Sequence, residues 1–400
     1  MTISSPSATV TQRLPDQGVV WLAGGALFLG ALVLTDIISL RMASLFLIGG
    51  LMGAALFHAS FGFTGGWRRF VEDKRGVAIR AQLAMVALAA LVFFPLLAQG
   101  EAFGQPLVGA LAPVGVSVVV GASLFGLGMQ LGGGCGSGTL FTVGGGSVRM
   151  LVTLAFFIIG ALGGTAHLPY WLSLPALEPI SLGASLGVPL GLGLTLAGLA
   201  AIAAITLLIE RRAHGNVEPI GAPLPQKGKL LTGPWPLLFA ALALAVLNVL
   251  TLIIAGHPWS ITAGFGLWGA KIASAFGVSV ADWEFWTWPG QARALQNSVL
   301  ADTTSVMDFG IILGAALAAG LAGKFAPKVD LRLGSLIAAV LGGLMMGYGA
   351  RLSFGCNIGA LFSGIASGSV HGWVWMICAF AGSVLGIRLR PLFFGRGASK

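Results

Sequence analysis

The sequence predicts an all-α integral membrane protein built from two inverted repeats, with about nine transmembrane helices plus re-entrant half-helices. Three observations lead to this prediction. Only 9% of the 400 residues are charged and 56% are hydrophobic, whereas a soluble domain has about 25% charged residues. Apolar runs long enough to cross the hydrocarbon layer recur along the chain. One glycine-rich motif occurs twice.

The repeated motif contains two of the three cysteines. Residues 126–141, GLGMQLGGGCGSGTLF, match residues 347–362, GYGARLSFGCNIGALF, at 8 of 16 positions with a constant offset of 356 − 135 = 221. Cys135 and Cys356 occupy the same place in the two copies, whereas Cys378 has no counterpart. The chain is therefore predicted to be an internal duplication.

Nine apolar segments are long enough to span a bilayer as helices: residues 19–36, 81–97, 106–128, 148–165, 188–209, 235–256, 306–324, 333–349 and 370–387. The first has no basic region before it and no small-residue cleavage site, so we expect it to stay in the membrane. Two shorter, glycine-rich segments, 42–58 and 263–276, hold matching positions under the offset. Each of these two segments could either cross the membrane or enter it and return to the same side.

The distribution of basic residues selects between these possibilities, because lysine and arginine stay on the cytoplasmic side. If both short segments dip in and return, 18 of the 22 Lys and Arg residues fall inside. If both cross, the loop around residues 324–332 and the basic tail are forced outside. The first arrangement is preferred, with the N-terminus outside and the C-terminus inside. The two copies then run in opposite directions through the membrane.

This topology divides the chain into five parts. We expect an external N-terminal tail, a first repeat, a connector helix with a cytoplasmic loop, a second repeat and a cytoplasmic tail, at residues 1–18, 19–187, 188–234, 235–390 and 391–400. Transporters with inverted repeats and discontinuous helices bind substrate near the midplane, where the copies meet.

Glycine, 62 of 400 residues, is concentrated in the repeated motifs. Irregular backbone survives in lipid only where protein or a water-filled cavity satisfies it, so these clusters are predicted to be re-entrant loops. Their free N–H groups and helix N-termini attract anions. Close helix packing is the alternative explanation for the glycines. The candidate substrate-binding residues are Cys135, Cys356, Gly134, Gly355, Ser137, Asn357 and Arg351.

The two repeated cysteines favour a soft, sulfur-containing substrate. Three cysteines in a large membrane bundle do not resemble a disulfide scaffold, and two opposed thiols make an incomplete metal site. A neutral thiol is a weak donor that suits a polarizable sulfur atom. Alternatively, Cys135 and Cys356 are small residues that only fill space in the buried core. Arg351 is expected at the outer mouth, either steering an anion or facing lipid headgroups. No metal and no cofactor are predicted.

At these residues the chain resembles the YeeE/YedE family of membrane proteins. The resemblance rests on the paired Gly-x-Gly, Gly-Cys and Gly-x-Leu-Phe patterns and on PWSITAGFGLWGAK at residues 258–271. It implies uptake of thiosulfate or a related sulfur anion across the bacterial inner membrane, with Cys135 and Cys356 handing the anion through a constriction. A third cysteine of the family has no counterpart in HASFGFTGGW, residues 58–67, so the exact sulfur anion stays open.

The expected partners are a small inorganic sulfur anion, the lipid bilayer and a cytoplasmic sulfur-carrier protein, with no nucleic acid. An enzyme is not predicted, because the sequence has no Ser/His/Asp set, no paired intramembrane carboxylates and no nucleotide-binding loop. An anion channel and a non-transporting helper protein remain as alternative functions.

Overall fold

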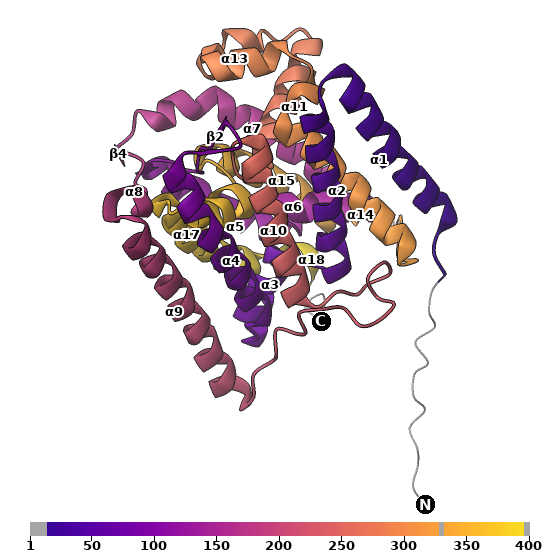
Figure 1. Cartoon of the computed structure of the whole chain (residues 1–400), viewed down its shortest axis with the longest axis vertical. Coiled ribbons are helices and arrows are strands. Elements are labelled where there is room, and N and C mark those ends of the chain that lie inside the picture. The colour runs from indigo at the N-terminus through magenta and orange to yellow at the C-terminus, as the bar shows by residue number, and fades with distance from the viewer. Residues whose placement is uncertain (1–13, 328–331, 396–400) are drawn as a thin grey trace, which may run out of the picture.

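The protein is a bundle of helices in a computed structural model that describes residues 14–327 and 332–395 (Figure 1). Within these residues, ten helical stretches are long and apolar enough to span a membrane. The four strands have two residues each, namely β1 (Glu101–Ala102), β2 (Gln105–Pro106), β3 (Val114–Gly115) and β4 (Ala176–Leu177). The predicted all-α membrane fold is confirmed.

The helices fall into two halves separated by α8 (Leu182–Leu186) and α9 (Val188–His214). The first half holds α1 (Gln17–Ile37), α2 (Leu40–Ala59), α3 (Phe63–Asp73), α4 (Val77–Gln99), α5 (Val116–Gly132), α6 (Gly136–Gly144) and α7 (Val148–Leu172). The second half holds α10 (Leu237–Ala255), α11 (Thr262–Ala275), η1 (Val280–Asp282), α12 (Glu284–Thr287), α13 (Pro289–Gln296), η2 (Val299–Ala301), α14 (Thr303–Leu321), α15 (Leu333–Leu352), η3 (Asn357–Ser363), α16 (Gly364–Ala366), α17 (Val370–Leu389) and α18 (Pro391–Phe394).

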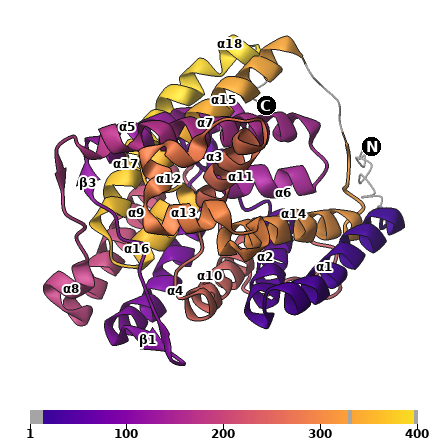
Figure 2. The ribbon, with the colours of Figure 1, turned by 90° about the horizontal axis from the view of Figure 1, so that it is seen from above.

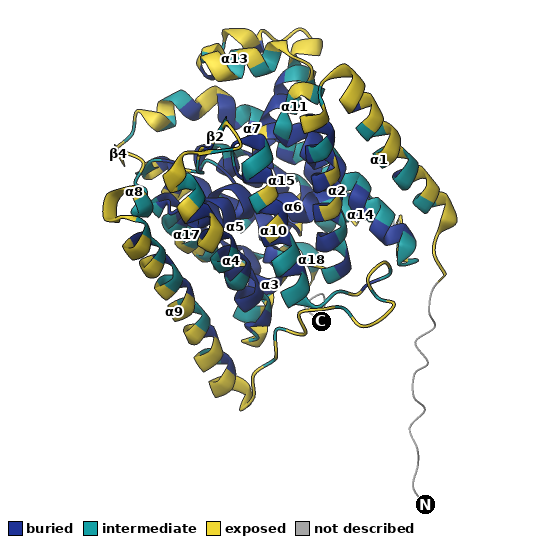
Figure 3. Ribbon diagram, viewed as in Figure 1, coloured by how far each residue is buried: buried dark blue, intermediate teal, exposed yellow. Residues whose placement is uncertain are grey.

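The 221-residue offset extends beyond the motifs to the order of the helices. Adding 221 to the first residues of α1, α6 and α7 gives 238, 357 and 369, and α10, η3 and α17 begin at 237, 357 and 370. The middle helices α8 and α9 have no counterpart in the second half. Most of α9, like α1, is exposed along the outer edge of the bundle, where lipid would cover it (Figure 3).

The two helices that precede the repeated cysteines, α5 and α15, cross in an antiparallel arrangement with reciprocal contacts. A Cβ on Gly121 would lie 2.7 Å from the carbonyl oxygen of Gly349, and one on Gly128 would lie 2.9 Å from that of Gly342. Under the offset, Gly342 corresponds to Gly121 and Gly349 corresponds to Gly128. Each contact therefore recurs with the halves exchanged, as contacts across a twofold axis do.

Residues 42–58 cross the bundle, which corrects the expectation that they dip in and return. They lie in α2, which has 20 residues and is about 30 Å long. The Arg41 guanidinium donates to the carbonyl of Ala255 at the end of α10, at 2.6 Å. At the other end, the N–H of Trp235, just before α10, donates to the carbonyl of His58 at 3.0 Å. Helix α2 thus runs antiparallel to α10 over its full length.

The segment that contains residues 263–276, in contrast, enters the bundle from one end and returns to the same end, as predicted. It includes α11, which has 14 residues. The preceding helix α10 ends beside Arg41, and the following helix α14 begins beside Met42, whose sulfur lies 3.9 Å from the hydroxyl of Thr303. The short helices between them, including α13, cap this end of the molecule (Figure 1).

Helix α1 begins at the end of the bundle opposite to the expected one. The N–H of Asp16 donates to the carbonyl of Gly320 at 2.8 Å, at the end of α14 that leads to the basic residues of the 324–332 loop. Figure 2 shows α1, α2 and α14 together at one edge. Because α2 crosses, the start of α1 shares a side with this loop, whereas residues 1–18 were expected on the other side. Residues 1–13 lie outside the described part.

Cysteine labelling tests the crossing of α2. In a Cys378→Ala background, a cysteine replacing Asp36, at the end of α1, should react with a membrane-impermeant maleimide added outside the cell. A cysteine replacing Lys74, after α3, should react only once the membrane is permeabilised. Both positions are exposed, so labelling of both from the same side would contradict the crossing.

Candidate site at the paired cysteines

The two repeated cysteines cap two short helices in the buried centre of the bundle. Gly138 at the start of α6 donates its N–H to the sulfur of Cys135 at 3.4 Å. Ile358 at the start of η3 donates to the sulfur of Cys356, also at 3.4 Å. Both side chains are 0% exposed and neither thiol is in a disulfide. Each sulfur thus holds the capping position that Ser, Thr, Asp or Asn usually occupies.

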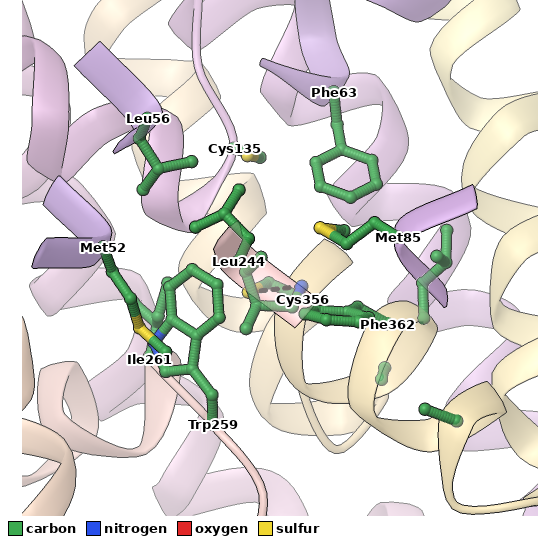
Figure 4. Packing of buried hydrophobic residues seen from close by; sticks show 14 of the residues in the cluster. Met52, Leu56, Phe63, Met85, Cys135, Leu244, Trp259, Ile261, Cys356 and Phe362 are labelled. Carbon is green, nitrogen blue, oxygen red and sulfur yellow. Dashed lines mark hydrogen bonds between the residues drawn. The ribbon is translucent and has the colours of Figure 1, made fainter. Parts of the chain in front are cut away.

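Gly136 lies where the two cysteines, both labelled in Figure 4, approach each other. A Cβ on Gly136 would lie 3.1 Å from the sulfur of Cys356, and Gly136 directly follows Cys135, with about 3.8 Å between their Cα atoms. The same Cβ would lie 3.4 Å from a methyl carbon of Ile261 and 3.6 Å from that of Thr262. The beginning of α11 therefore closes a third side, and a side chain at position 136 would crowd the thiol.

Several helix N-termini converge on the two thiols. Besides α6 and η3, α11 begins at Thr262 beside Gly136, and the backbone of Phe63 at the start of α3 contacts the Cys135 thiol. Helix N-termini present unpaired N–H groups and the positive end of the helix dipole. This arrangement favours a small anion between the thiols.

Ser137 and Asn357, both predicted as site residues, are buried beside the cysteines. The Ser137 hydroxyl lies 3.4 Å from the sulfur of Cys135. Neither the amide oxygen nor the amide nitrogen of Asn357 has a hydrogen-bond partner among the described residues. Leaving a buried donor or acceptor unpaired costs about 1–3 kcal/mol. The Asn357 amide is therefore available to donate to an oxygen of a bound anion.

Gly134 and Gly355 shape the turns that lead into the cysteines. Gly355 has φ +149°, and a Cβ there would lie 2.7 Å from the backbone nitrogen of Ala360. A Cβ on Gly134 would lie 3.0 Å from the carbonyl carbon of Gly138. Both glycines thus allow the chain to fold back closely onto the following helix. In the structure, the two glycines therefore shape the turns that position the thiols.

Arg351 lies at a cavity on the side of the bundle opposite the basic loops. The cavity has a volume of about 220 Å³, and its lining includes Ser260, Thr262, Arg351 and Gly355. The Arg351 guanidinium donates to the carbonyl of Thr262 at 3.4 Å and lies 5.2 Å from the ring centre of Phe285. Because Gly355 directly precedes Cys356, this positive charge stands on the route to the thiols, where it would attract an anion.

Sequence reasoning missed Asp308, on α14. Its side chain is 0% exposed, and neither carboxyl oxygen has a hydrogen-bond partner among the described residues. The available signal was a single acidic residue within an apolar segment, which by itself suggests function in a membrane protein. Cys378, in contrast, lies partly exposed on α17.

Comparison with known proteins identifies the family. A family model described as sulphur transport matches residues 58–385. This chain belongs to the sulphur transport (YeeE/YedE) family. The match includes both cysteine motifs and most of the predicted spans. Together with the ten candidate spans, the family makes this a multi-pass membrane protein of a transporter family.

Curated relatives within the family differ in how much of the chain they match. The probable transporter YedE of Escherichia coli (strain K12) is 33% identical over 165 residues, 40% of this chain and 39% of that protein. The thiosulfate transporter TsuA of Spirochaeta thermophila is 26% identical over 342 residues, 84% of this chain and 95% of that protein. The thiosulfate transporter TsuA of Escherichia coli is 25% identical over 353 residues, 84% of this chain and 90% of that protein. The chain thus spans about two fifths of YedE and nearly all of each TsuA.

Proposed function

We propose that this protein imports thiosulfate or a closely related sulfur anion across the bacterial inner membrane, passing it between the thiols of Cys356 and Cys135. The observation that carries the proposal is the approach of the two repeated cysteines at Gly136, in the buried centre. Membership of the sulphur transport family and similarity to proteins named thiosulfate transporter support the substrate class.

The proposed route begins at the outer cavity. A dianion meets the positive charge of Arg351 there and moves past Gly355 to Cys356. At Cys356, the Asn357 amide and backbone N–H groups donate to its oxygens, while the thiol contacts its polarizable sulfur. The anion then shifts to Cys135 at the start of α6. Thiols donate weakly, so each site holds the anion without retaining it, which transport requires.

We infer that the halves, residues 19–187 and 235–390, are inverted repeats about an axis in the membrane plane. The reciprocal glycine contacts of α5 and α15 support this inference, as does their antiparallel crossing. The two cysteine motifs then approach the midplane from opposite faces as re-entrant loops. Residues 188–234 connect the repeats, and the start of α1 and the tail from residue 391 share the cytoplasmic side.

The burial of the site favours a carrier over an open pore. Both cysteines are 0% exposed and lie within the main hydrophobic cluster, so an anion reaches them only when neighbouring elements move. Such gating is typical of alternating access. No catalytic role is proposed, and delivery of the imported sulfur to a cytoplasmic carrier protein stays a prediction from the family resemblance.

Flux measurements with purified protein in liposomes test the function. We expect saturable uptake of radiolabelled thiosulfate, accelerated when unlabelled thiosulfate is present inside, and competition by other sulfur anions with a terminal sulfur atom. A matched protein with both Cys135 and Cys356 replaced by alanine should show background uptake. Non-saturating flux would identify a channel. If liposomes that contain correctly folded protein show no flux, transport would be excluded and the non-transporting helper function would be favoured.

A further inference from the structure

Asp308 places a carboxyl group in the apolar part of the bundle without a polar partner. It lies on α14, five residues after the helix begins, which corresponds to about 7.5 Å along the axis. A Cβ on Gly264 of α11 would lie 3.1 Å from one of its carboxyl oxygens. The absence of a side chain at Gly264 therefore leaves the carboxyl facing α11 directly.

The elements packed against α14 supply no cation to this carboxyl. Helices α1 and α2 carry their titratable groups near their ends, α6 carries none, α11 carries only Lys271, and η2 leads into Asp302. The Lys271 ammonium donates to the carbonyl of Leu295 at 2.8 Å. Asp302 and the thiol of Cys356 lie near Asp308, and the guanidinium of Arg351 lies against Gly266 of α11, two residues from Gly264. The terminal groups of α1 and α2 are Asp16, Asp36, Arg41 and His58.

An ionised carboxylate in this position would be very costly. Burying an unpaired charge costs far more free energy than burying a neutral carboxylic acid, so Asp308 is protonated while the site is closed. A bound metal ion is a poor alternative to the proton, because the described part of the chain has no group of three His, Cys, Asp or Glu side chains that could hold one. The proton is the cation that fits this carboxyl.

The position of Asp308 links its proton to the substrate route. Gly264 follows Ala263 and Thr262, which line the cavity that contains Arg351, so a small movement of α11 would expose the carboxyl to this cavity. Ionised Asp308 would repel an anion at Cys356, whereas the protonated form would not. Binding of the anion and of the proton therefore favour each other, and this coupling is reciprocal.

We propose that Asp308 binds a proton from the outer cavity and carries it inward with the sulfur anion, which makes the protein a proton–anion symporter. This inference rests on the proposed transport function. Moving one negative charge into a cell against 100 mV costs about 2.3 kcal/mol, and each cotransported proton removes one charge from the transported complex. Coupled protons would thus allow a dianion to accumulate.

Liposomes with a trapped pH indicator test the proposal. For the parent protein, adding thiosulfate outside should acidify the lumen, and an inward gradient of one pH unit should raise the uptake plateau up to about tenfold per coupled proton. In Asp308→Asn, which cannot release a proton, both effects should disappear. Asp302→Asn, which keeps a side chain able to cap α14, should retain both, and Asp308→Glu should retain lumen acidification.

A binding measurement keeps the test decisive if Asp308→Asn does not transport. The affinity of the purified parent for thiosulfate should rise as pH falls, by up to about tenfold per pH unit, whereas that of Asp308→Asn should not change with pH. Thiosulfate uptake by the parent without lumen acidification would overturn the symport proposal alone. An affinity of Asp308→Asn for thiosulfate that changes with pH would also overturn the symport proposal. Lack of any thiosulfate uptake by the folded parent would instead overturn the proposed function.

Discussion

Replacing Cys135 or Cys356 by alanine should abolish growth on thiosulfate as sulfur source and lower uptake into liposomes by at least about tenfold, a loss of ~1.4 kcal/mol in the rate-limiting step. Alanine removes the thiol contact and leaves an apolar surface against the anion. It also removes the sulfur that accepts the N–H of Gly138 or Ile358, so part of any loss would come from an uncapped helix.

Serine separates the two effects of each cysteine. A serine hydroxyl is a better helix cap than a thiol, so Cys135→Ser and Cys356→Ser should fold as well as the parent. A hydroxyl is harder and more strongly hydrated, and we therefore expect it to restore little transport. Cys378→Ala, on the partly exposed face of α17, is the matched control and should be nearly silent. Parental uptake by well-expressed alanine variants would disprove the thiol relay.

The two halves of the site are not chemically equivalent. Asn357, after Cys356, corresponds under the offset to Gly136, after Cys135. The buried amide of Asn357 has no hydrogen-bond partner, whereas Gly136 leaves room for the opposite thiol. The helices also differ, because η3 is a π-helix and α6 is a regular α-helix. π-Helical turns are often found at functional sites. The asymmetry would make binding of the anion from the outside differ from binding from the inside.

The repeat predicted most of the fold, because a duplicated sequence specifies a duplicated set of helices. The offset found in 16 residues also gives the starts of α10 and α17 to within one residue. It failed for α2 and α11, which occupy equivalent sequence positions but differ in length. Gly277, with φ +84°, ends α11 in a left-handed turn, as C-terminal glycines do. The equivalent position in α2 is Leu56, and that helix continues.

Charge counting was unable to reveal the direction of α1. With α2 dipping in and returning, Arg41 lies inside and Arg13 lies outside; with α2 crossing, the two exchange places and 18 of the 22 basic residues are still inside. The hydrogen bond from Arg41 to Ala255 decides the matter. It joins residues 214 positions apart, and no local sequence pattern specifies such a contact.

The site was predictable where the repeat marked it and hidden where it depended on packing. Identical placement identified Cys135 and Cys356 as a pair. Their capping role was not predicted, because sulfur is an unusual helix cap. The isolation of Asp308 depends on Gly264, a residue 44 positions away on another helix. A lone acidic residue in an apolar segment was the only signal that the sequence offered.

Helix α7 provides a matched pair of glycines to test the close packing that supports the site. A Cβ on Gly160 would collide with the carbonyl oxygen of Leu344 on α15, whereas one on Gly163 would meet nothing within 4 Å. Both changes to alanine raise helix propensity equally, by about 1 kcal/mol. Gly163→Ala should therefore be neutral or stabilising. Gly160→Ala should lower stability, because overpacking costs about 1–3 kcal/mol and backbone must move.

The measurement is the yield of monodisperse protein and the midpoint of thermal unfolding for each variant in the same detergent. Because α15 carries Arg351 and leads directly to Cys356, separating α7 from α15 should also reduce thiosulfate uptake by the Gly160→Ala protein that does fold. Gly163→Ala should transport at the parental rate. Equal unfolding midpoints for the two variants would mean that α7 and α15 do not approach as closely as described, and the support for the geometry around Cys356 would be lost.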